Sequence, residues 1–119
     1  MTKILLVDDD PTGSSLLKMF LELENFSVTT VHDLEQARHA LDENTRLVLL
    51  DYHLSRNVSG LLLLEEIRAG KTDSAKETPV IITSGDDRAN QASIEQGANA
   101  FMHKPFGPSD LVAVIHTLI

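Results

Sequence analysis

The chain has 119 residues, 42% of them hydrophobic, and ten Lys and Arg against eighteen Asp and Glu give it a formal net charge of −8. An acidic chain with 4% aromatic residues lacks the positive charge that binds phosphate backbones and the rings that stack on bases, which argues against direct nucleic-acid binding. Without cysteine it has no disulfides or thiolate metal sites, and no apolar run is long enough for a signal peptide or a bilayer span, so we predict one cytoplasmic domain over residues 1–119, not associated with a membrane.

The first third of the chain alternates between strand-like and helix-like patterns. Residues 4–7 form a continuous apolar run, typical of a buried parallel strand. Pro11 suits a first helical turn, and apolar residues follow it at helical spacing: Leu16, Leu17, Phe20, Leu21 and Leu23. Residues 26–31 alternate and predict a second strand, after which Asp33 and Gln36 resemble a capping box that opens a second helix.

The same alternation continues to the end of the chain. Residues 52–59 are typical of a loop, and so is the polar segment 70–78. Ser109 is expected to cap the last helix. The further predicted elements are a strand at 47–50 that ends at Asp51, a helix at 61–67, a strand at 80–83, a helix at 89–96, a strand at 100–103 and a helix from Ser109 to Ile119.

Five rounds of strand then helix predict an α/β fold, a doubly wound five-stranded parallel sheet with helices on both faces. Ligands of such sheets bind beyond the carboxyl ends of the strands. The residues that end the first, third, fourth and fifth strands should therefore meet at one edge: Asp8 and Asp9, Asp51, Thr83 and Ser84, and His103 and Lys104.

The residues at this edge are the parts of a phosphoryl-transfer site. Clustered carboxylates repel one another unless a cation holds them, and Mg²⁺ prefers oxygen ligands. A metal and a lysine could neutralise phosphoryl oxygens while one carboxylate acts as the nucleophile. Singly, Asp8 and Asp9 could be a solvated helix start, Asp51 a turn residue and Lys104 a surface lysine. Their shared position at strand ends favours the site.

Four segments, "ILLVDDDP", "LVLLDYHL", "PVIITSG" and "GANAFMHKPF", resemble the receiver domains of two-component response regulators in order and in spacing. The resemblance covers nearly the whole chain. It implies a flavodoxin-like sheet of strand order 2-1-3-4-5 and a Lys104–Pro105 bond that is often cis. It also implies a signalling domain rather than an enzyme, whose only chemistry is its own phosphorylation and dephosphorylation.

The resemblance further assigns the phosphoacceptor and the metal ligands. Asp51 would take a phosphoryl group from a histidine kinase or a histidine phosphotransfer protein. Asp9 would bind Mg²⁺ directly, Asp8 would do so through a water, and Asp51 and the backbone carbonyl of His53 would complete the protein ligands. The loop at 52–59 lacks the family's usual proline and is about one residue longer, so the resemblance does not predict the shape of this loop.

The resemblance assigns the switch to three other residues. Ser84 would hydrogen-bond the new phosphoryl group, and Lys104 would pair with it. Phe101 matches the aromatic residue whose rotamer tracks activation. The face built from the fourth helix, the fifth strand and the last helix would then change and control an output domain or a partner protein.

A rival interpretation is a phosphatase similar to the haloacid dehalogenases. "DDDPT" would supply Asp8 as the nucleophile together with Asp10 and Thr12, and Ser84 and Lys104 would serve there too. The match is incomplete, because that family has a further acidic pair after its lysine. It also leaves Asp51 without a role.

The last helix carries apolar residues on more than one stripe, which indicates a surface for a partner protein or for a second copy in a homodimer. These residues are Leu111, Val112, Val114, Ile115, Leu118 and Ile119. The kinase, the signal and the output are not encoded in any motif. The chain could be a complete single-domain regulator or the receiver of a longer protein.

Overall fold

A computed structural model describes all of residues 1–119 and confirms the predicted fold class. The main sheet has five parallel strands in the order β2-β1-β3-β6-β7, which is the order 2-1-3-4-5 along the chain. The strands are β1 (Thr2–Val7), β2 (Phe26–Val31), β3 (Leu47–Asp51), β6 (Val80–Ser84) and β7 (Ala100–His103).

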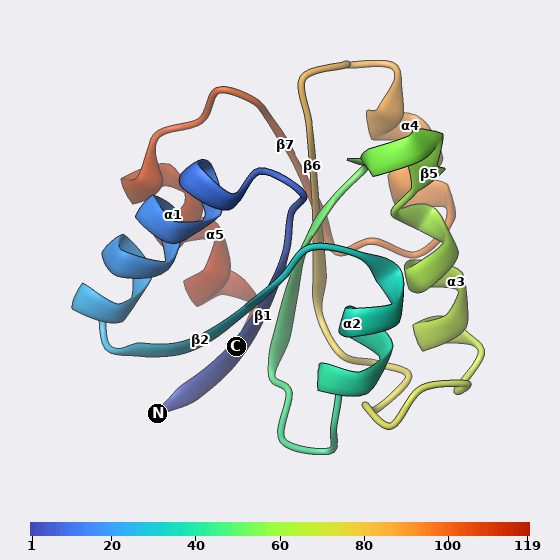
Figure 1. Ribbon diagram of the computed structural model, residues 1–119, viewed down its shortest axis with the longest axis horizontal. Coiled ribbons are helices and arrows are strands. Elements are labelled where there is room, and N and C mark those ends of the chain that lie inside the picture. Colours follow the sequence, from blue (N-terminus) through green and yellow to red (C-terminus); the bar gives the residue numbers. More distant parts are fainter.

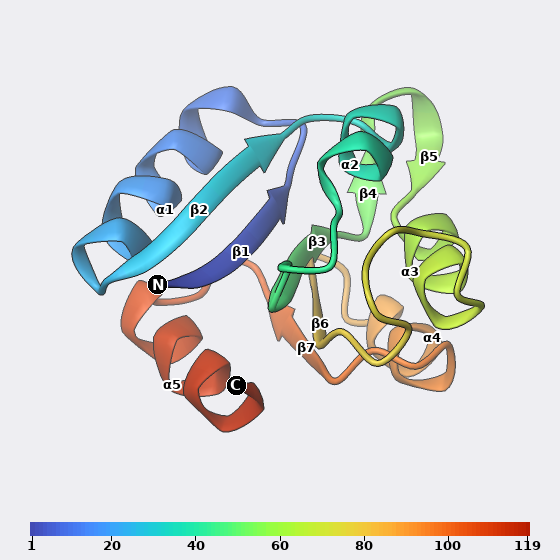
Figure 2. The same cartoon turned by 90° about the horizontal axis from the view of Figure 1, so that it is seen from below.

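Five helices cover the two faces of this sheet (Figures 1 and 2). Two of them lie on one face: α1 (Pro11–Leu23) and α5 (Pro108–Leu118). The other face is covered by α2 (Leu34–Ala40), α3 (Leu61–Arg68) and α4 (Ala89–Glu95). None of these helices is both long and apolar enough to cross a membrane.

The central strand β3 shows why one sheet supports two cores. All five of its residues are buried, and neighbouring side chains point to opposite faces. Val48 and Leu50 pack in the core under α2 and α3, whereas Leu47 and Leu49 pack in the core under α1 and α5. A strand buried on both faces has no solvated side, so its last residue, Asp51, is carried into a buried position as well.

The apolar residues of α1 divide into two sets that the sequence does not distinguish. Leu21 is fully buried, and Leu17 and Phe20 pack against the core. Leu16 and Leu23, which share the predicted helical spacing, are 64% and 82% exposed. Together with Met19, which is 62% exposed, they form an apolar stripe on the solvent side of the helix.

Two helix starts were predicted from capping residues, and one of them is confirmed. The Asp33 carboxylate accepts a hydrogen bond from the Gln36 amide at 2.7 Å, and the Gln36 side chain accepts an amide hydrogen bond from just before the helix at 2.8 Å. Ser109 does not cap the last helix, because α5 begins one residue earlier at Pro108, after Gly107. Proline is suited to a first helical position, where its missing N–H has no partner to lose.

The extra apolar stripe of α5 is less exposed than the sequence predicts. Leu111 and Ile115 are fully buried, and Val112, Val114 and Leu118 pack against the same core. Ile119, 42% exposed just after the helix, is the most exposed large apolar residue of this segment. The area that α5 alone can offer to a partner is therefore small.

Residues 52–59 are not a plain loop. They form a two-stranded antiparallel hairpin, in which β4 (His53–Leu54) pairs with β5 (Val58–Ser59) around a 3₁₀ turn at Ser55–Asn57. Arg56 and Asn57 have φ of 64° and 59°, a conformation that side chains other than glycine adopt rarely. The buried side chain of Leu54 anchors the hairpin in the core.

Gly60 lets this hairpin return to the end of β3. Its amide donates to the Tyr52 carbonyl at 2.7 Å, and a Cβ at this position would lie 2.1 Å from the Asp51 carbonyl oxygen. Only glycine permits so close an approach. The hairpin therefore begins and ends beside Asp51.

Candidate functional site

The strand ends that the sequence singled out meet at one edge of the sheet. Asp8 and Asp9 directly follow β1, Asp51 ends the adjacent strand β3, and Lys104 directly follows β7. One carboxylate oxygen from each of the three aspartates lies within 4.8 Å of the others. The structure therefore brings together the carboxylates and the lysine that were predicted to converge.

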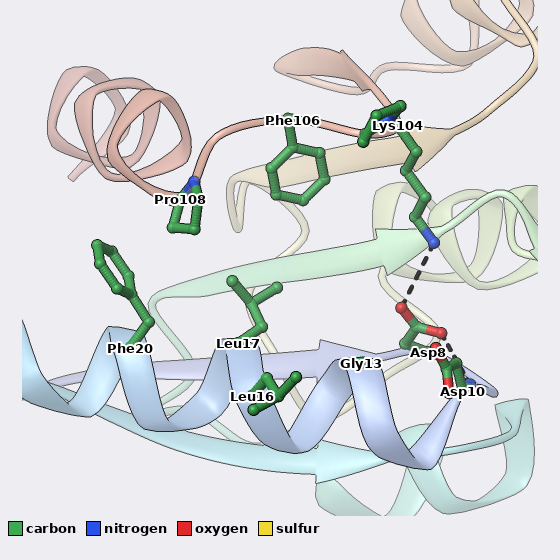
Figure 3. A pocket seen from close by; sticks show the side chains of 10 residues that line it. Asp8, Asp10, Gly13, Leu16, Leu17, Phe20, Lys104, Phe106 and Pro108 are labelled. Carbon is green, nitrogen blue, oxygen red and sulfur yellow. Dashed lines mark hydrogen bonds and ion pairs between the residues drawn. The ribbon is translucent and has the colours of Figure 1, made fainter.

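Lys104 is the cation that Asp8 and Asp51 share. Its Nζ lies 3.2 Å from Oδ2 of Asp51 and 3.4 Å from Oδ2 of Asp8, and Figure 3 shows the side chain extended toward Asp8. Burial by itself would lower the pKa of Lys104, but the charges of Asp51 and Asp8 outweigh it and raise that pKa above its ordinary value. The ammonium therefore stays charged at this edge.

Asp51 is the most buried of the three carboxylates, with 7% of its surface exposed. Burial raises the pKa of its carboxyl group above the ordinary value and Asp8 adds to the rise, although Lys104 opposes it. The His53 amide donates a hydrogen bond to Oδ1 of Asp51 at 3.3 Å. Asp51 is thus a shielded, oriented carboxylate with a cation on one oxygen.

Ser84 stands beside this cluster at the end of β6. Its side chain is almost fully buried, and its hydroxyl accepts a hydrogen bond from the Asp86 amide at 3.0 Å. The Lys104 amide donates to the Ser84 carbonyl at 2.8 Å, so these two residues are fixed side by side. Two residues back along the same strand pair, Phe101 is the register partner of Ile82 and packs, half-buried, against the core under α2 and α3.

The donor set of the three aspartates fits a divalent cation that prefers oxygen. Three carboxylates within reach of one another are the ligands that Mg²⁺ takes, usually with several waters kept. His53 is close enough for its amide to contact Asp51, and its side chain is exposed. The residues present therefore fit the predicted metal, with Asp8, Asp9 and Asp51 as its carboxylates.

One contact of this cluster was not predicted from the sequence. The hydroxyl of Ser55, in the turn of the hairpin, donates to Oδ2 of Asp9 at 2.9 Å. The segment "YHLSRNVSG" differs from the family's usual pattern, and that difference was the available signal. It could not indicate which of its polar residues would reach the carboxylates.

A pocket of about 570 Å³ opens beside the cluster, between α1 and the segment from Lys104 to Pro108 (Figure 3). Asp8, Asp10 and Lys104 line one end of it. Leu16, Leu17, Phe20 and Phe106 make the rest apolar. The carboxylate of Asp10 accepts a hydrogen bond from the Thr12 amide at 3.2 Å, so it caps α1 as an N-cap residue does.

The fold and this edge define a class: a flavodoxin-like α/β domain with an aspartate cluster and a lysine at its topological switch point. Comparison with known proteins is more specific. Residues 4–116 match the family described as the response regulator receiver domain. The chain belongs to this family.

Two curated relatives in that family are named as transcriptional regulatory proteins and are about twice as long. The transcriptional regulatory protein CpxR of Escherichia coli is 39% identical over 121 residues, which cover 100% of this chain and 50% of CpxR. ResD of Bacillus subtilis is 32% identical, with 99% and 48% covered. The chain spans about half the length of the curated relatives it matches.

Solved structures of receiver domains have the same fold as this chain. The receiver domain of NtrX from Brucella abortus superposes with a TM-score of 0.86 at 33% identity, covering 97% of this chain and 96% of that one. A CheY-like receiver domain protein from Methanospirillum hungatei has a TM-score of 0.86 at 26% identity, covering 98% and 92%.

The cis Lys104–Pro105 bond agrees with what the resemblance implies.

Proposed function

We propose that this receiver domain accepts a phosphoryl group on Asp51, with Mg²⁺, from the phosphohistidine of a histidine kinase or phosphotransfer protein. The observation that carries the proposal is the buried Asp51 carboxylate, with Lys104 at 3.2 Å and the oxygens of Asp8 and Asp9 grouped around it. Membership of the receiver family supports the direction of transfer.

Each residue of the site would have a separate role in the phosphoryl transfer. An oxygen of Asp51 attacks phosphorus, the phosphorus–nitrogen bond breaks, and the electron pair leaves with the histidine ring. Lys104 holds a positive charge where the phosphoryl oxygens come to lie. Mg²⁺, when bound by the aspartates, adds charge neutralisation at the same oxygens. Burial keeps bulk water from competing with these contacts.

The rival phosphatase mechanism would use Asp8 as the nucleophile, and burial argues against it. Asp8 and Asp51 each accept a hydrogen bond from a backbone amide and each face Lys104, so these contacts do not distinguish them. Asp51 is the more deeply buried of the two, and the phosphatase mechanism would leave it without a role.

Mapping the phosphorylated residue separates the two mechanisms. The chain is incubated with acetyl phosphate and Mg²⁺, and the modified aspartate is identified by mass spectrometry after borohydride reduction. We expect one group, labile to hydroxylamine, on Asp51. A label on Asp8 would instead support the phosphatase mechanism.

Thermal unfolding tests the binding of the metal. Mg²⁺ that binds only the folded chain should stabilise it by mass action, by about 1.4 kcal/mol when the free Mg²⁺ concentration is ten times the Kd, and the melting temperature should rise accordingly. Asp9→Ala should remove this rise, because it deletes one of three clustered carboxylates. Asp73→Ala, at an exposed loop position, is the matched control. An equal rise in all three proteins would mean that Mg²⁺ acts elsewhere or only screens charge.

The geometry and the relatives together support a proposal for the output of the switch. Ser84 ends β6 and Lys104 directly follows β7, and these two strands lead into α4 and α5. We propose that phosphorylation changes the face made by α4, β7 and α5. Because relatives named as transcriptional regulatory proteins are twice as long, the partner of that face would be an output domain or a separate regulatory protein.

A further inference from the structure

Ser55 is the only residue of the hairpin at 53–59 whose side chain hydrogen-bonds the loop after β1. Its hydroxyl reaches Oδ2 of Asp9 at 2.9 Å, across 46 residues of sequence. No other side-chain hydrogen bond or ion pair joins this hairpin to Asp8, Asp9 or Asp10. The Ser55 hydroxyl alone therefore joins the side chains of the hairpin to the loop after β1.

The turn at Ser55 borders a cavity of about 580 Å³ on the side of α2, lined among others by His32, Arg38 and Arg56. Ser55 and Arg56 are both exposed, and Arg56 occupies the left-handed conformation with φ of 64°. A residue other than glycine keeps this conformation only where its surroundings hold it there. The buried side chain of Leu54 is one such contact, and the bond from Ser55 to Asp9 is another.

We propose that Ser55 is a positioning residue of the metal site: its hydroxyl orients the Asp9 carboxylate so that Mg²⁺ binds between Asp9, Asp8 and Asp51. The inference rests on the proposed function, because it assumes that these carboxylates hold Mg²⁺. An O–H···O⁻ bond is among the stronger neutral-donor hydrogen bonds, and it fixes the rotation of the carboxylate that accepts it. Groups that orient metal ligands in this way change metal affinity by about 10–100-fold when removed.

The Ser55–Asp9 hydrogen bond also couples Mg²⁺ binding to the order of the hairpin. A cation on Asp9 fixes that carboxylate, and the fixed carboxylate holds Ser55 in return. Since linkage is reciprocal, whatever orders the hairpin should tighten Mg²⁺ binding, and Mg²⁺ should protect the hairpin. The hairpin starts and ends beside Asp51 through the Gly60–Tyr52 hydrogen bond of 2.7 Å, so this order is imposed next to the phosphoacceptor.

The experiment measures Mg²⁺ affinity by isothermal titration calorimetry on the 119-residue chain. Ser55→Ala should raise the Kd for Mg²⁺ about tenfold, and Ser55→Thr, which keeps a hydroxyl, should restore most of the affinity. Ser59→Ala is the matched control, because its hydroxyl lies on the other arm of the same hairpin and accepts only from the Leu61 amide at 3.2 Å. It should leave the Kd unchanged.

A second readout follows the hairpin itself. Amide hydrogen exchange of residues 53–59 should slow when Mg²⁺ saturates the wild-type chain and should slow much less in Ser55→Ala. A wild-type Kd in Ser55→Ala, or an equal loss in Ser59→Ala, would overturn the positioning role while leaving the metal site intact. Absence of Mg²⁺ binding by the wild-type chain would overturn the metal site, and this inference with it.

Discussion

Asp51→Asn is expected to take up no phosphoryl group at all from acetyl phosphate and Mg²⁺, whereas the wild-type chain takes up one. The amide lacks the anionic oxygen that attacks phosphorus, and no other carboxylate has the same burial and the same cation at 3.2 Å. Intact-mass spectrometry of the two proteins after equal incubation measures the difference. A full label on Asp51→Asn would place the acceptor elsewhere.

Asp51→Asn should also change the free energy of unfolding, and the size of this change should depend on pH. Burial raises the pKa of Asp51, so the folded chain holds that proton more tightly than the unfolded chain does. The stability from this group is present below its ordinary pKa and is lost as the pH rises through the raised pKa of the folded state. Asparagine does not titrate, and Lys104 keeps Asp8 as a partner at 3.4 Å.

Asp51→Asn should therefore melt at a higher temperature than the wild-type chain at neutral pH without Mg²⁺. The difference should shrink as the pH falls to below roughly 4, where the carboxyl group becomes protonated in both states. Asp73→Asn, at an exposed loop position, controls for the loss of one negative charge from an acidic chain. If it raised the melting temperature as much, net charge rather than burial would explain the effect.

The elements that the sequence predicts well are those with one dominant physical cause. The apolar runs that became β1, β3 and β6 are buried on both faces, which is the environment typical of parallel strands with such runs. Once the strands are known, the meeting of Asp8, Asp51 and Lys104 follows from the topology of parallel sheets alone. The candidate site was predictable for that reason, before any side chain was placed.

The misses lie where several weak causes compete. Leu16 and Leu23 share the helical spacing of Leu21, and only the direction in which α1 packs decides that they are exposed. The hairpin at 53–59 needs left-handed conformations at Arg56 and Asn57, and arginine gives no signal for one. Ser55 became part of the site through that turn, so its contact with Asp9 could not be seen in the sequence.

Ser84→Ala and Lys104→Arg are expected to separate phosphorylation from its output. A phosphoryl group on Asp51 brings roughly two negative charges and strong acceptor oxygens. Ser84, beside Lys104 at the end of β6, can turn its hydroxyl to donate to them in place of accepting from the Asp86 amide. This movement would vacate space near Phe101, which is only half-buried, and allow its ring to turn inward.

Both variants should still accept phosphate on Asp51, more slowly, but pass little of the change to the face made by α4, β7 and α5. A hydrogen bond to a charged group contributes about 1.5–3 kcal/mol, so losing it should shift the balance between the two packings at least about tenfold. Arginine keeps the charge of Lys104 but not its compact, rotatable donor. The phosphoryl group acts only through contacts that it makes better in one packing than in the other.

The measurement is amide NMR across residues 87–119, with and without saturating beryllofluoride and Mg²⁺, on chains shown to be fully occupied at Asp51. Wild type should show changes along α4, β7 and α5, and both variants should show much smaller ones. Thr83→Val is the matched control, since it removes a hydroxyl from the same strand, on the opposite face, and should respond as wild type does. If Ser84→Ala and Lys104→Arg respond as fully as the control, the phosphoryl group reaches that face by a route that does not pass through Ser84 and Lys104.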